Sequence, residues 1–579
     1  MAAQLAADSN ADQAPSARRF EIFFFVGLAV LAALMFYRAS FGMEWLGDDA
    51  YTLSTATRYV QGDRPIVDSW ETHFSSDMMA APIVWALDRV SPDGTGLVLH
   101  YRYVFVVLQI IFAFVVWRLL RGLLPPPAAM LTSWIVFAYL PYYYVLLNYN
   151  WTRTATFTIA ALLLLRLCGR EKPSPWPAVT AGVLYAIGTF AYPTMIVAVP
   201  FVVAGVWWAR CNRAGKVIGW FLGGFFAFLA ASVVVTIAWA GTAHLAQVLP
   251  LFTHPGDRDM SLVAIFARFN RTRAVLGAPL VGSIVFAALA LTLRSRPQRD
   301  AIALTGAILA SVLTALVTPS LPHPLLFYMD IPQAIMFGIG TAFLLLVIIS
   351  KDRYYRRLFW LLYLPTIGMA IGASFASLEG FETATMPAII TAIAAFLALN
   401  HAVEKAKTVG ASARVNWLVP VALVTVLVAL VVSDGWYYGG DSPVTQLTAR
   451  LDQGAYAGIA TTPANAALYA HYTKVFEPVR AAGGRTAFLE AFPTGYLMTG
   501  VRPGAYSVWS NFASGNRWQE YLDITGNYPT TIVSTRIPGP NGGLVAKPFA
   551  PPLGLRDFAS KYYEIYRDAD FVIYKRRTP

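Results

Sequence analysis

The sequence predicts an all-α polytopic membrane protein that carries a small α/β domain at its C-terminus. Hydrophobic residues make up 57% of the 579 residues and charged residues only 13%, against about 45–50% and about 25% in soluble domains. Apolar runs of the length that crosses a bilayer, about 20 residues, recur between residues 20 and 433. After that point the composition shifts to Gly, Pro, Asp, Asn and Thr. These observations exclude a soluble globular enzyme and a disordered chain.

The apolar runs define the expected membrane spans. About thirteen stretches are long and apolar enough, and they cover residues 20–38, 101–121, 128–147, 153–168, 177–191, 193–209, 217–240, 275–293, 301–319, 325–349, 358–376, 386–402 and 416–433. Together they form a transmembrane domain over 20–433. Residues 1–19 are polar, and we expect a disordered cytoplasmic N-terminus there. No small-residue cleavage site follows the first run, which is therefore expected to stay as a helix.

Basic residues gather in alternate loops. Pairs such as Arg118 and Arg121 fall on one side, while the short outer turns carry none. The positive-inside rule then places the N-terminus in the cytoplasm and the domain over 434–579 outside the cytoplasmic membrane. The formal net charge of +12 has the same origin, so we expect no nucleic-acid partner. Cys168 and Cys211 fall at the inner, reducing side, where no disulfide is expected.

Three outer segments are too long to be plain connectors. They cover residues 39–100, 242–274 and the tail over 434–579. In the tail, helical stretches are expected over 443–451, 462–472 and 517–522, and β-rich runs over 530–534 and 571–575.

Two adjacent carboxylates, Asp48 and Asp49, follow the first helix directly. A carboxylate at the membrane surface can take a proton from a hydroxyl as a general base. The second carboxylate can orient the first or hold a divalent cation, Mg²⁺ or Mn²⁺, which makes Asp49 a candidate metal ligand. The alternative is a helix N-cap for residues 51–60. The apolar stretch over 77–90 is too short to span and predicts an interfacial helix.

Two further groups of polar residues lie near the outer face. The second outer segment carries cations suited to phosphate, and these are His254, Arg258, Arg268, Arg271 and Arg273. Their alternative use is anchoring in lipid head groups. Tyr149, Asn150 and Tyr192 are candidates for binding an acceptor or a sugar. Their alternative use is an interfacial aromatic belt.

The string GDDAYTLSTATRYVQGDRPIVDSWETHF resembles the first outer loop of membrane-embedded glycosyltransferases of the GT-C fold. The similar branch contains bacterial protein mannosyltransferase-like and lipid A aminoarabinose transferase-like enzymes. The shared pattern is the acidic pair before Ala-Tyr, a helix that ends at Gly62, and Asp-x-Trp-Glu at residues 68–71. Where the family has a basic-Pro-Pro turn, this chain has Thr-His-Phe-Ser at residues 72–75. The family lysine is therefore absent, and His73 takes its place.

This resemblance implies an enzyme of the cell envelope that moves a single sugar from a polyprenyl-phosphate donor to an acceptor hydroxyl outside the membrane, with inversion. Asp48 matches the family's base, and Trp70, Glu71 and His73 join the candidates for the acceptor or sugar site. Composition typical of a GC-rich genome suggests arabinofuranose or mannose as the donor sugar. The acceptor would be a glycan, a lipid or a protein. The alternatives are a transporter or lipid-glycan flippase, and a ligase that transfers whole glycans.

Overall fold

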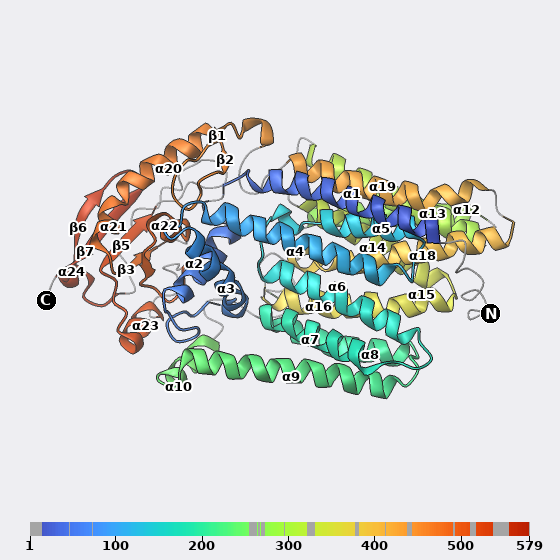
Figure 1. Cartoon of the computed structure of the whole chain (residues 1–579), viewed down its shortest axis with the longest axis horizontal. Helices are drawn as coiled ribbons and strands as arrows, with labels where there is room; N and C mark the ends of the chain where they lie inside the picture. Colours follow the sequence, from blue (N-terminus) through green and yellow to red (C-terminus); the bar gives the residue numbers. More distant parts are fainter. Residues whose placement is uncertain are drawn as a thin grey trace.

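The computed structural model shows a long helical bundle with a smaller mixed domain at one end (Figure 1). The chain begins at the far end of the bundle, and the C-terminal domain lies at the opposite end. The structure describes residues 14–43, 45, 47–71, 73–253, 263, 267, 273–293, 296–320, 330–376, 381–410, 413–436, 443–489, 492–509, 517–535 and 555–577.

Each stretch for which a span is expected contains a helix. Within the described residues, eight helices are long and apolar enough to cross a membrane, and further apolar helices are shorter. The polytopic helical class is therefore confirmed, while the number of about thirteen spans stays a prediction. The bundle contains α1 (Ala14–Ala39), α4 (Leu97–Leu120), α5 (Pro126–Ala138), α6 (Tyr149–Cys168), α7 (Pro175–Ala191), α8 (Val199–Trp208), α9 (Ala214–Ala240), α12 (Gly277–Thr292), α13 (Arg296–Val317), α14 (Ile331–Ile349), α15 (Arg353–Leu358), α16 (Leu364–Ala376), α18 (Ala388–Thr408) and α19 (Leu418–Trp436).

Short helical segments join these helices. They are η1 (Pro141–Tyr143), η2 (Pro193–Ala198), α10 (Leu245–Thr253), η3 (Arg273–Leu276), η4 (Thr318–Ser320), η6 (Phe359–Tyr363), α17 (Phe381–Thr385) and η7 (Ala413–Trp417).

Helices α7 and α9 approach each other through glycines. A Cβ at Gly182 would lie 2.0 Å from the carbonyl oxygen of Phe221, and one at Gly224 would lie 2.3 Å from that of Val179. Small residues let helix backbones pack closely where no water is displaced to drive association. Either glycine replaced by alanine would force α7 and α9 apart.

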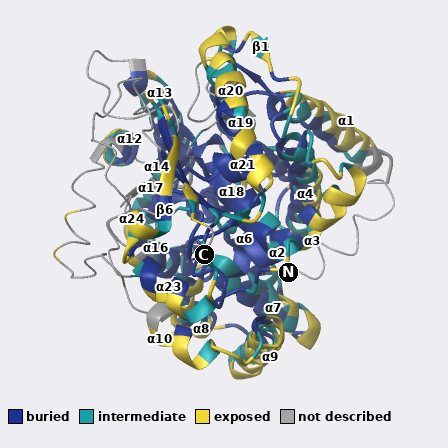
Figure 2. Cartoon of the chain, turned by 90° about the vertical axis from the view of Figure 1, so that its left-hand side faces the viewer, coloured by how far each residue is buried: buried dark blue, intermediate teal, exposed yellow. Residues whose placement is uncertain are grey.

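The centre and the rim of the bundle differ in exposure (Figure 2). Helix α18 is rich in alanine and buried over most of its length. Helices α1 and α9 instead expose large apolar side chains, such as Phe23 at 59% and Val234 at 65%. Apolar surface on this scale fits a lipid environment and not water. The rim is therefore the membrane-facing surface of the bundle.

Basic loops that are expected on one side of the membrane meet at one end of the bundle. Arg121, just after α4, forms an ion pair of 2.6 Å with Glu21 of α1. Arg166, near the end of α6, donates from Nη1 to the carbonyl oxygen of Arg118 at 3.0 Å. This end lies away from the C-terminal domain (Figure 1).

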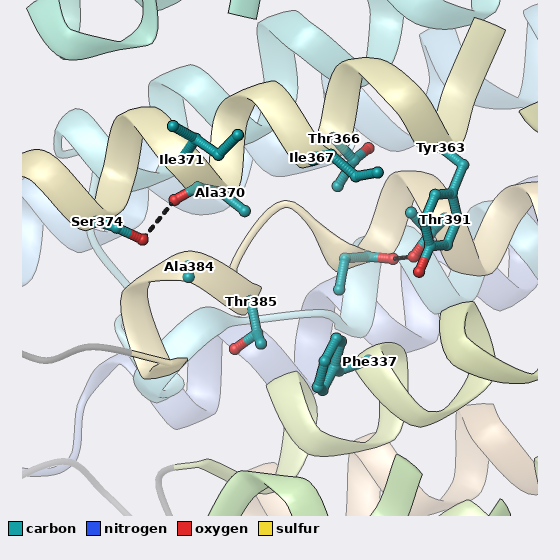
Figure 3. Close-up of a pocket in the computed structure, with 11 residues that line it drawn as sticks. Phe337, Tyr363, Thr366, Ile367, Ala370, Ile371, Ser374, Ala384, Thr385 and Thr391 are labelled. Carbon is teal, nitrogen blue, oxygen red and sulfur yellow. Dashed lines mark hydrogen bonds between the residues drawn. The ribbon is translucent and has the colours of Figure 1, made fainter. Parts of the chain in front are cut away.

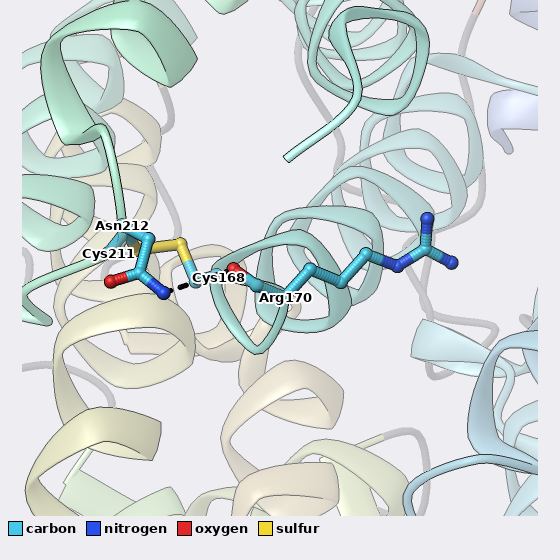
Figure 4. The surroundings of a disulfide bond; sticks show 4 residues. All are labelled: Cys168, Arg170, Cys211 and Asn212. Atoms are coloured by element: carbon cyan, nitrogen blue, oxygen red, sulfur yellow. Dashed lines mark hydrogen bonds between the residues drawn. A yellow bond between two sulfur atoms is a disulfide. The ribbon is translucent and has the colours of Figure 1, made fainter. Parts of the chain in front are cut away.

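The expectation of two free cysteines is wrong, because Cys168 and Cys211 form a disulfide (Figure 4). The end of α6 meets the turn between α8 and α9, which brings the two Cα atoms to 4.6 Å, a distance that a disulfide can bridge. Asn212 also donates to the carbonyl oxygen of Arg170 at 3.2 Å, beside the bond. The two cysteines are 43 residues apart, and the sequence at a helix end does not indicate which other segment packs against it. The contact could therefore not be predicted from the sequence.

Two helices lie between the bundle and the C-terminal domain. They are α2 (Asp48–Val60) and α3 (Phe74–Val90). The second shows that the stretch over 77–90 is helical, while its place at the membrane interface stays a prediction. The N-cap residue of α2 is Gly47, and no side chain caps the helix. The capping alternative is therefore wrong, because Asp48 and Asp49 are already the first two helical residues.

The C-terminal domain is built on a five-stranded mixed sheet in the order β4-β3-β5-β7-β6. Strand β3 pairs in parallel with β4 and β5, while β7 pairs antiparallel with β5 and β6. A small α/β domain is thereby confirmed. The strands are β1 (Ala449–Arg450), β2 (Ala460–Thr461), β3 (Arg485–Phe488), β4 (Arg502–Pro503), β5 (Thr531–Thr535), β6 (Tyr562–Arg567) and β7 (Phe571–Arg576).

The helices of this domain are α20 (Pro463–Val475), α21 (Glu477–Ala482), α22 (Thr494–Thr499), α23 (Arg517–Thr525) and α24 (Phe558–Lys561). The helix expected over 443–451 is wrong. That segment forms the short turn η8 (Val444–Gln446) and strand β1, which pairs antiparallel with β2. A pairing partner ten residues ahead decides this conformation, and local propensity does not show it.

Candidate active site

Asp48 faces the beginning of α6 and is buried there. Its Oδ2 accepts hydrogen bonds from Asn148 Nδ2 and Tyr149 OH, both at 3.2 Å. Asn148 is also the N-cap of α6, where its Oδ1 accepts from the backbone N–H of Trp151 at 3.0 Å. The cap fixes the amide so that its N–H points to Asp48. The acidic pair and the segment at Tyr149, which were separate candidates in the sequence, thus meet at the Asp48 carboxylate.

Aromatic rings form a wall beside this carboxylate. His73, the residue before α3, stacks on Tyr149 with ring centres 3.7 Å apart and an angle of 9°. Tyr192, at the end of α7, lies 5.3 Å from the His73 ring and 5.5 Å from the Tyr149 ring. Three of the residues predicted for sugar or acceptor binding are therefore brought together next to Asp48.

Asp49 has different surroundings. Its Oδ2 is held by Arg102 near the start of α4, with Nε at 2.9 Å and Nη2 as a second donor. Arg102 also donates to the carbonyl oxygens of Ala39 and Phe41 at 3.1 and 3.0 Å. The ion pair is buried on both sides and ties α2 to the end of α1 and to α4.

These contacts bear on the predicted divalent cation. A cation at the predicted ligand, Asp49, would meet the Arg102 guanidinium, which already occupies Oδ2 and carries a positive charge. Within the ranges that the structure describes, no group of three or more His, Cys, Asp or Glu side chains is arranged to hold a metal. The residues at Asp49 therefore do not fit the ion.

A further carboxylate, Asp77, was hidden in the sequence by its apolar neighbours. It lies in the first turn of α3, is fully buried, and its Oδ2 has no hydrogen-bond partner in the described part of the chain. Burial raises the pKa of Asp77 well above its ordinary value, and the nearby carboxylates of Glu71 and Asp48 raise it further. Asp77 therefore favours its neutral form beside Asp48.

Glu71 and Trp70 contact the C-terminal domain. Glu71 Oε1 accepts from the backbone N–H of Val508 at 2.6 Å, and Oε2 accepts from Ser507 Oγ at 2.8 Å. Burial raises the pKa of Glu71, although these bonds and the charge of Arg58 oppose the shift. The backbone N–H of Trp70 donates to the carbonyl oxygen of residue 506 at 2.7 Å. Both side chains hold the loop between α2 and α3 against the domain.

Asp63 carries the strongest link between this loop and the domain. It is fully buried and forms ion pairs with Arg58 of α2 at 2.7 Å and with Arg485 and Arg502 of the domain at 2.6 Å each. Burial would raise the pKa of Asp63, but the charge of Arg58 and the bonds from Arg485 hold it below its ordinary value. Nothing in the sequence indicates this cluster, because Arg485 and Arg502 lie more than four hundred residues from Asp63.

Asn150 and Arg153 extend the site along α6. Both are buried, and Asn150 Oδ1 has no hydrogen-bond partner among the described residues. The guanidinium of Arg153 lies over the Tyr192 ring at 4.3 Å, so it adjoins the aromatic wall.

The predicted phosphate-binding segment cannot be placed in this geometry. His254, Arg258, Arg268 and Arg271 lie outside the described residues, and Arg273 is described only as the first residue of η3. Their role stays a prediction.

No protein-family model matches the sequence, and no curated protein is detectably similar. Solved structures share its chain arrangement. One is Archaeoglobus fulgidus oligosaccharyltransferase tethered to an acceptor peptide with the NVT sequon, at 11% identity and TM-score 0.46, covering 96% of this chain and 74% of that one.

The same archaeal enzyme has been solved with an inhibitory peptide and a dolichol-phosphate, at 13% identity and TM-score 0.47, covering 89% and 70%. Its complex with Zn and sulfate matches at 13% identity and TM-score 0.45, covering 88% and 67%.

Proposed function

We propose that this protein is a membrane glycosyltransferase that moves a single sugar from a polyprenyl-phosphate donor to an acceptor hydroxyl. One observation carries the proposal: Asp48, from the segment that resembles the GT-C outer loop, is a buried carboxylate oriented by Asn148 and Tyr149. Helix α2, which Asp48 begins, lies beside the C-terminal domain, at the end of the bundle away from the basic loops (Figure 1).

The reaction assigns a role to each group. Asp48 takes the proton of the acceptor hydroxyl as the oxygen attacks the anomeric carbon. The bond between that carbon and the phosphate oxygen breaks, the polyprenyl phosphate leaves with its electron pair, and the configuration inverts. His73, Tyr149 and Tyr192 offer ring faces to the sugar. The raised pKa of Asp77 favours its uncharged form, which keeps a second negative charge away from the Asp48 carboxylate.

The arginines at 268, 271 and 273 remain candidates for the donor phosphate, on the strength of their charge and their place before α12. Replacing each with alanine is expected to weaken donor binding, because charge-assisted bonds to phosphate contribute roughly 1.5–3 kcal/mol. Three single variants with unchanged donor affinity would leave these residues as a membrane anchor.

Arabinofuranose and mannose are the proposed sugars, and a glycan, a lipid or a protein is the acceptor. A transporter or flippase is the second candidate. It would place charged groups along a path across the membrane, whereas the carboxylates Asp48, Asp49 and Asp77 gather at one end of the bundle.

The deciding experiment is sugar transfer by the purified protein from radiolabelled polyprenyl-phosphate sugars. Asp48→Asn keeps an oxygen that accepts from Asn148 and Tyr149, so folding should survive, while transfer should fall by roughly 10²–10⁴-fold with donor binding little changed. Asp93→Asn is the control, because Asp93 is exposed and bonds only Ser91 and Thr95. A folded Asp48→Asn protein that transfers at the wild-type rate would remove Asp48 as the base.

A further inference from the structure

Arg153 is a fully buried arginine with hydrogen-bond donors that have no partner among the described residues. Its Nη2 contacts the sulfur of Met386 at 2.9 Å and the carbonyl oxygen of Thr383 at 3.5 Å. Its Nε and Nη1 have no hydrogen-bond partner, and no acidic side chain of the described residues forms an ion pair with it. A buried charge without a counter-ion strongly destabilises a protein. A buried guanidinium with two free donor atoms is suited to binding an anion.

Arg153 lies close to the candidate base. It follows Tyr149 by one helical turn on α6, and Tyr192 contacts both residues. Because α6 begins at the Asp48 end of the bundle, Arg153 lies one turn further into the bundle than Tyr149. An anion at Arg153 would thus sit next to the aromatic wall, on the side of the membrane interior.

An apolar cavity of about 230 Å³ lies between α14, α16 and the segment at Ala384 and Thr385 (Figure 3). Its wall includes Ala384 and Thr385, which lie directly between the two residues that contact the guanidinium. Ile371 also lines it and is 37% exposed on the rim of the bundle, so the cavity reaches the lipid-facing surface. The remaining apolar wall comes mainly from Phe337 of α14, Tyr363 of η6 and Ile367 of α16.

We propose that Arg153 binds the phosphate of the lipid-linked donor and that this cavity takes the adjoining part of its apolar chain. The proposal rests on the proposed function for the identity of the donor. Its support is charge complementarity: an unpaired guanidinium whose contacts, Thr383 and Met386, directly flank two residues of an apolar cavity fits a ligand that has an anionic head and an apolar tail. Free phosphate would satisfy the arginine but would leave the cavity unused.

The test is ligand-dependent thermal stability of the full-length protein in detergent. Decaprenyl phosphate is the probe, and decaprenol and inorganic phosphate are the comparison arms. The wild type should be stabilised by decaprenyl phosphate and far less by either comparison compound. In Arg153→Met, affinity for decaprenyl phosphate should fall roughly ten- to a hundredfold. The unfolding temperature without ligand should hold or rise, because an uncompensated buried charge is gone.

Three further variants keep the inference falsifiable. Arg153→Lys keeps the charge but loses the planar donor set, so its affinity should be intermediate. Ile371→Trp should narrow the cavity and weaken binding without touching the charge. Arg166→Met, on the same helix at its opposite end, should bind as the wild type does. Unchanged affinity in Arg153→Met, or equal stabilisation by inorganic phosphate, would overturn the proposal.

The binding test is independent of catalysis. If the wild type transfers sugar and the Arg153→Met variant does so with the same KM, the role of Arg153 is refuted and the proposed function stands. Wild type that binds decaprenyl phosphate through Arg153 but transfers no sugar would refute the function and keep the site.

Discussion

Asp63→Asn should release the loop between α2 and α3 from the C-terminal domain. The substitution keeps the size of the side chain and removes its charge. It leaves Arg58, Arg485 and Arg502 together without a counter-ion. Because this loop carries Glu71 and leads into His73, release would also disturb the wall beside Asp48.

The magnitude follows from the exposure of each partner. Of the two pairs that cross to the domain, Asp63–Arg485 is the more buried, with side chains 0% and 16% exposed, and breaking a buried pair costs about 3–5 kcal/mol. Arg502 is 41% exposed, so its pair adds at most about 1 kcal/mol. Since asparagine still accepts one hydrogen bond, we expect about 3 kcal/mol, which lowers the docked-to-released ratio roughly 150-fold.

Hydrogen exchange on the purified protein measures this loss. Amides of residues 58–71 and 485–503 should exchange faster in Asp63→Asn, with a lower unfolding temperature. Asp452→Asn, at an exposed position in the domain, should match the wild type. Acid should act in the same way. The native pKa of Asp63 is depressed. Its contribution to the stability of the docked loop is therefore present above the ordinary pKa of an aspartate and is lost as pH falls through the native pKa. Unchanged exchange in both segments at neutral pH would refute the reasoning.

Three further predictions follow from buried groups. Asp77 has a raised native pKa, so its contribution to the stability of the fold is present below the ordinary pKa of an aspartate and is lost as pH rises through the native pKa. Asp77→Asn should therefore flatten the dependence of the unfolding temperature on pH at the alkaline side, while transfer activity is kept. An unchanged dependence on pH would contradict this. Asp49→Asn should leave Arg102 without its counter-ion and lower the unfolding temperature by the loss of about 3–5 kcal/mol; activity that responds to Mg²⁺ without such destabilisation would favour a metal role instead. The Cys168–Cys211 bond should block both thiols from a PEG-maleimide in denatured, unreduced protein, whereas two added labels would show that the thiols are free.

The sequence predicted elements that depend on local pattern. Apolar length placed the bundle helices, and the composition shift placed the C-terminal domain. The acidic pair and the segment at Tyr149 were both singled out, and the structure brings them together at Asp48. Only the family resemblance favoured Asp48 over Asp49 as the base. The residues alone did not, because the structural difference is the bond from Arg102 to Asp49, and Arg102 is about fifty residues away and looks like any other arginine near a helix start.

Contacts across long stretches of chain were not predictable. Asp77 looked like part of an apolar interfacial helix, and only burial beside Glu71 and Asp48 shows its chemistry. The disulfide depends on how α6 meets the turn after α8. The strand β3 is short and central, and its partners decide its conformation more than its own residues do.

The ion pairs at Asp63 also set an order of events during synthesis. Asp63 and Arg485 are separated by 422 residues, and a ribosome that adds about 5–20 residues per second needs roughly 20–85 s to pass from one to the other. Throughout that interval the growing chain holds Asp63 with Arg58 alone. The loop beside Asp48 reaches its final packing only once the last part of the chain has emerged and folded. A chain that ended before residue 485 would therefore lack two of the three ion pairs of Asp63, and the domain would not hold the loop beside Asp48 in place.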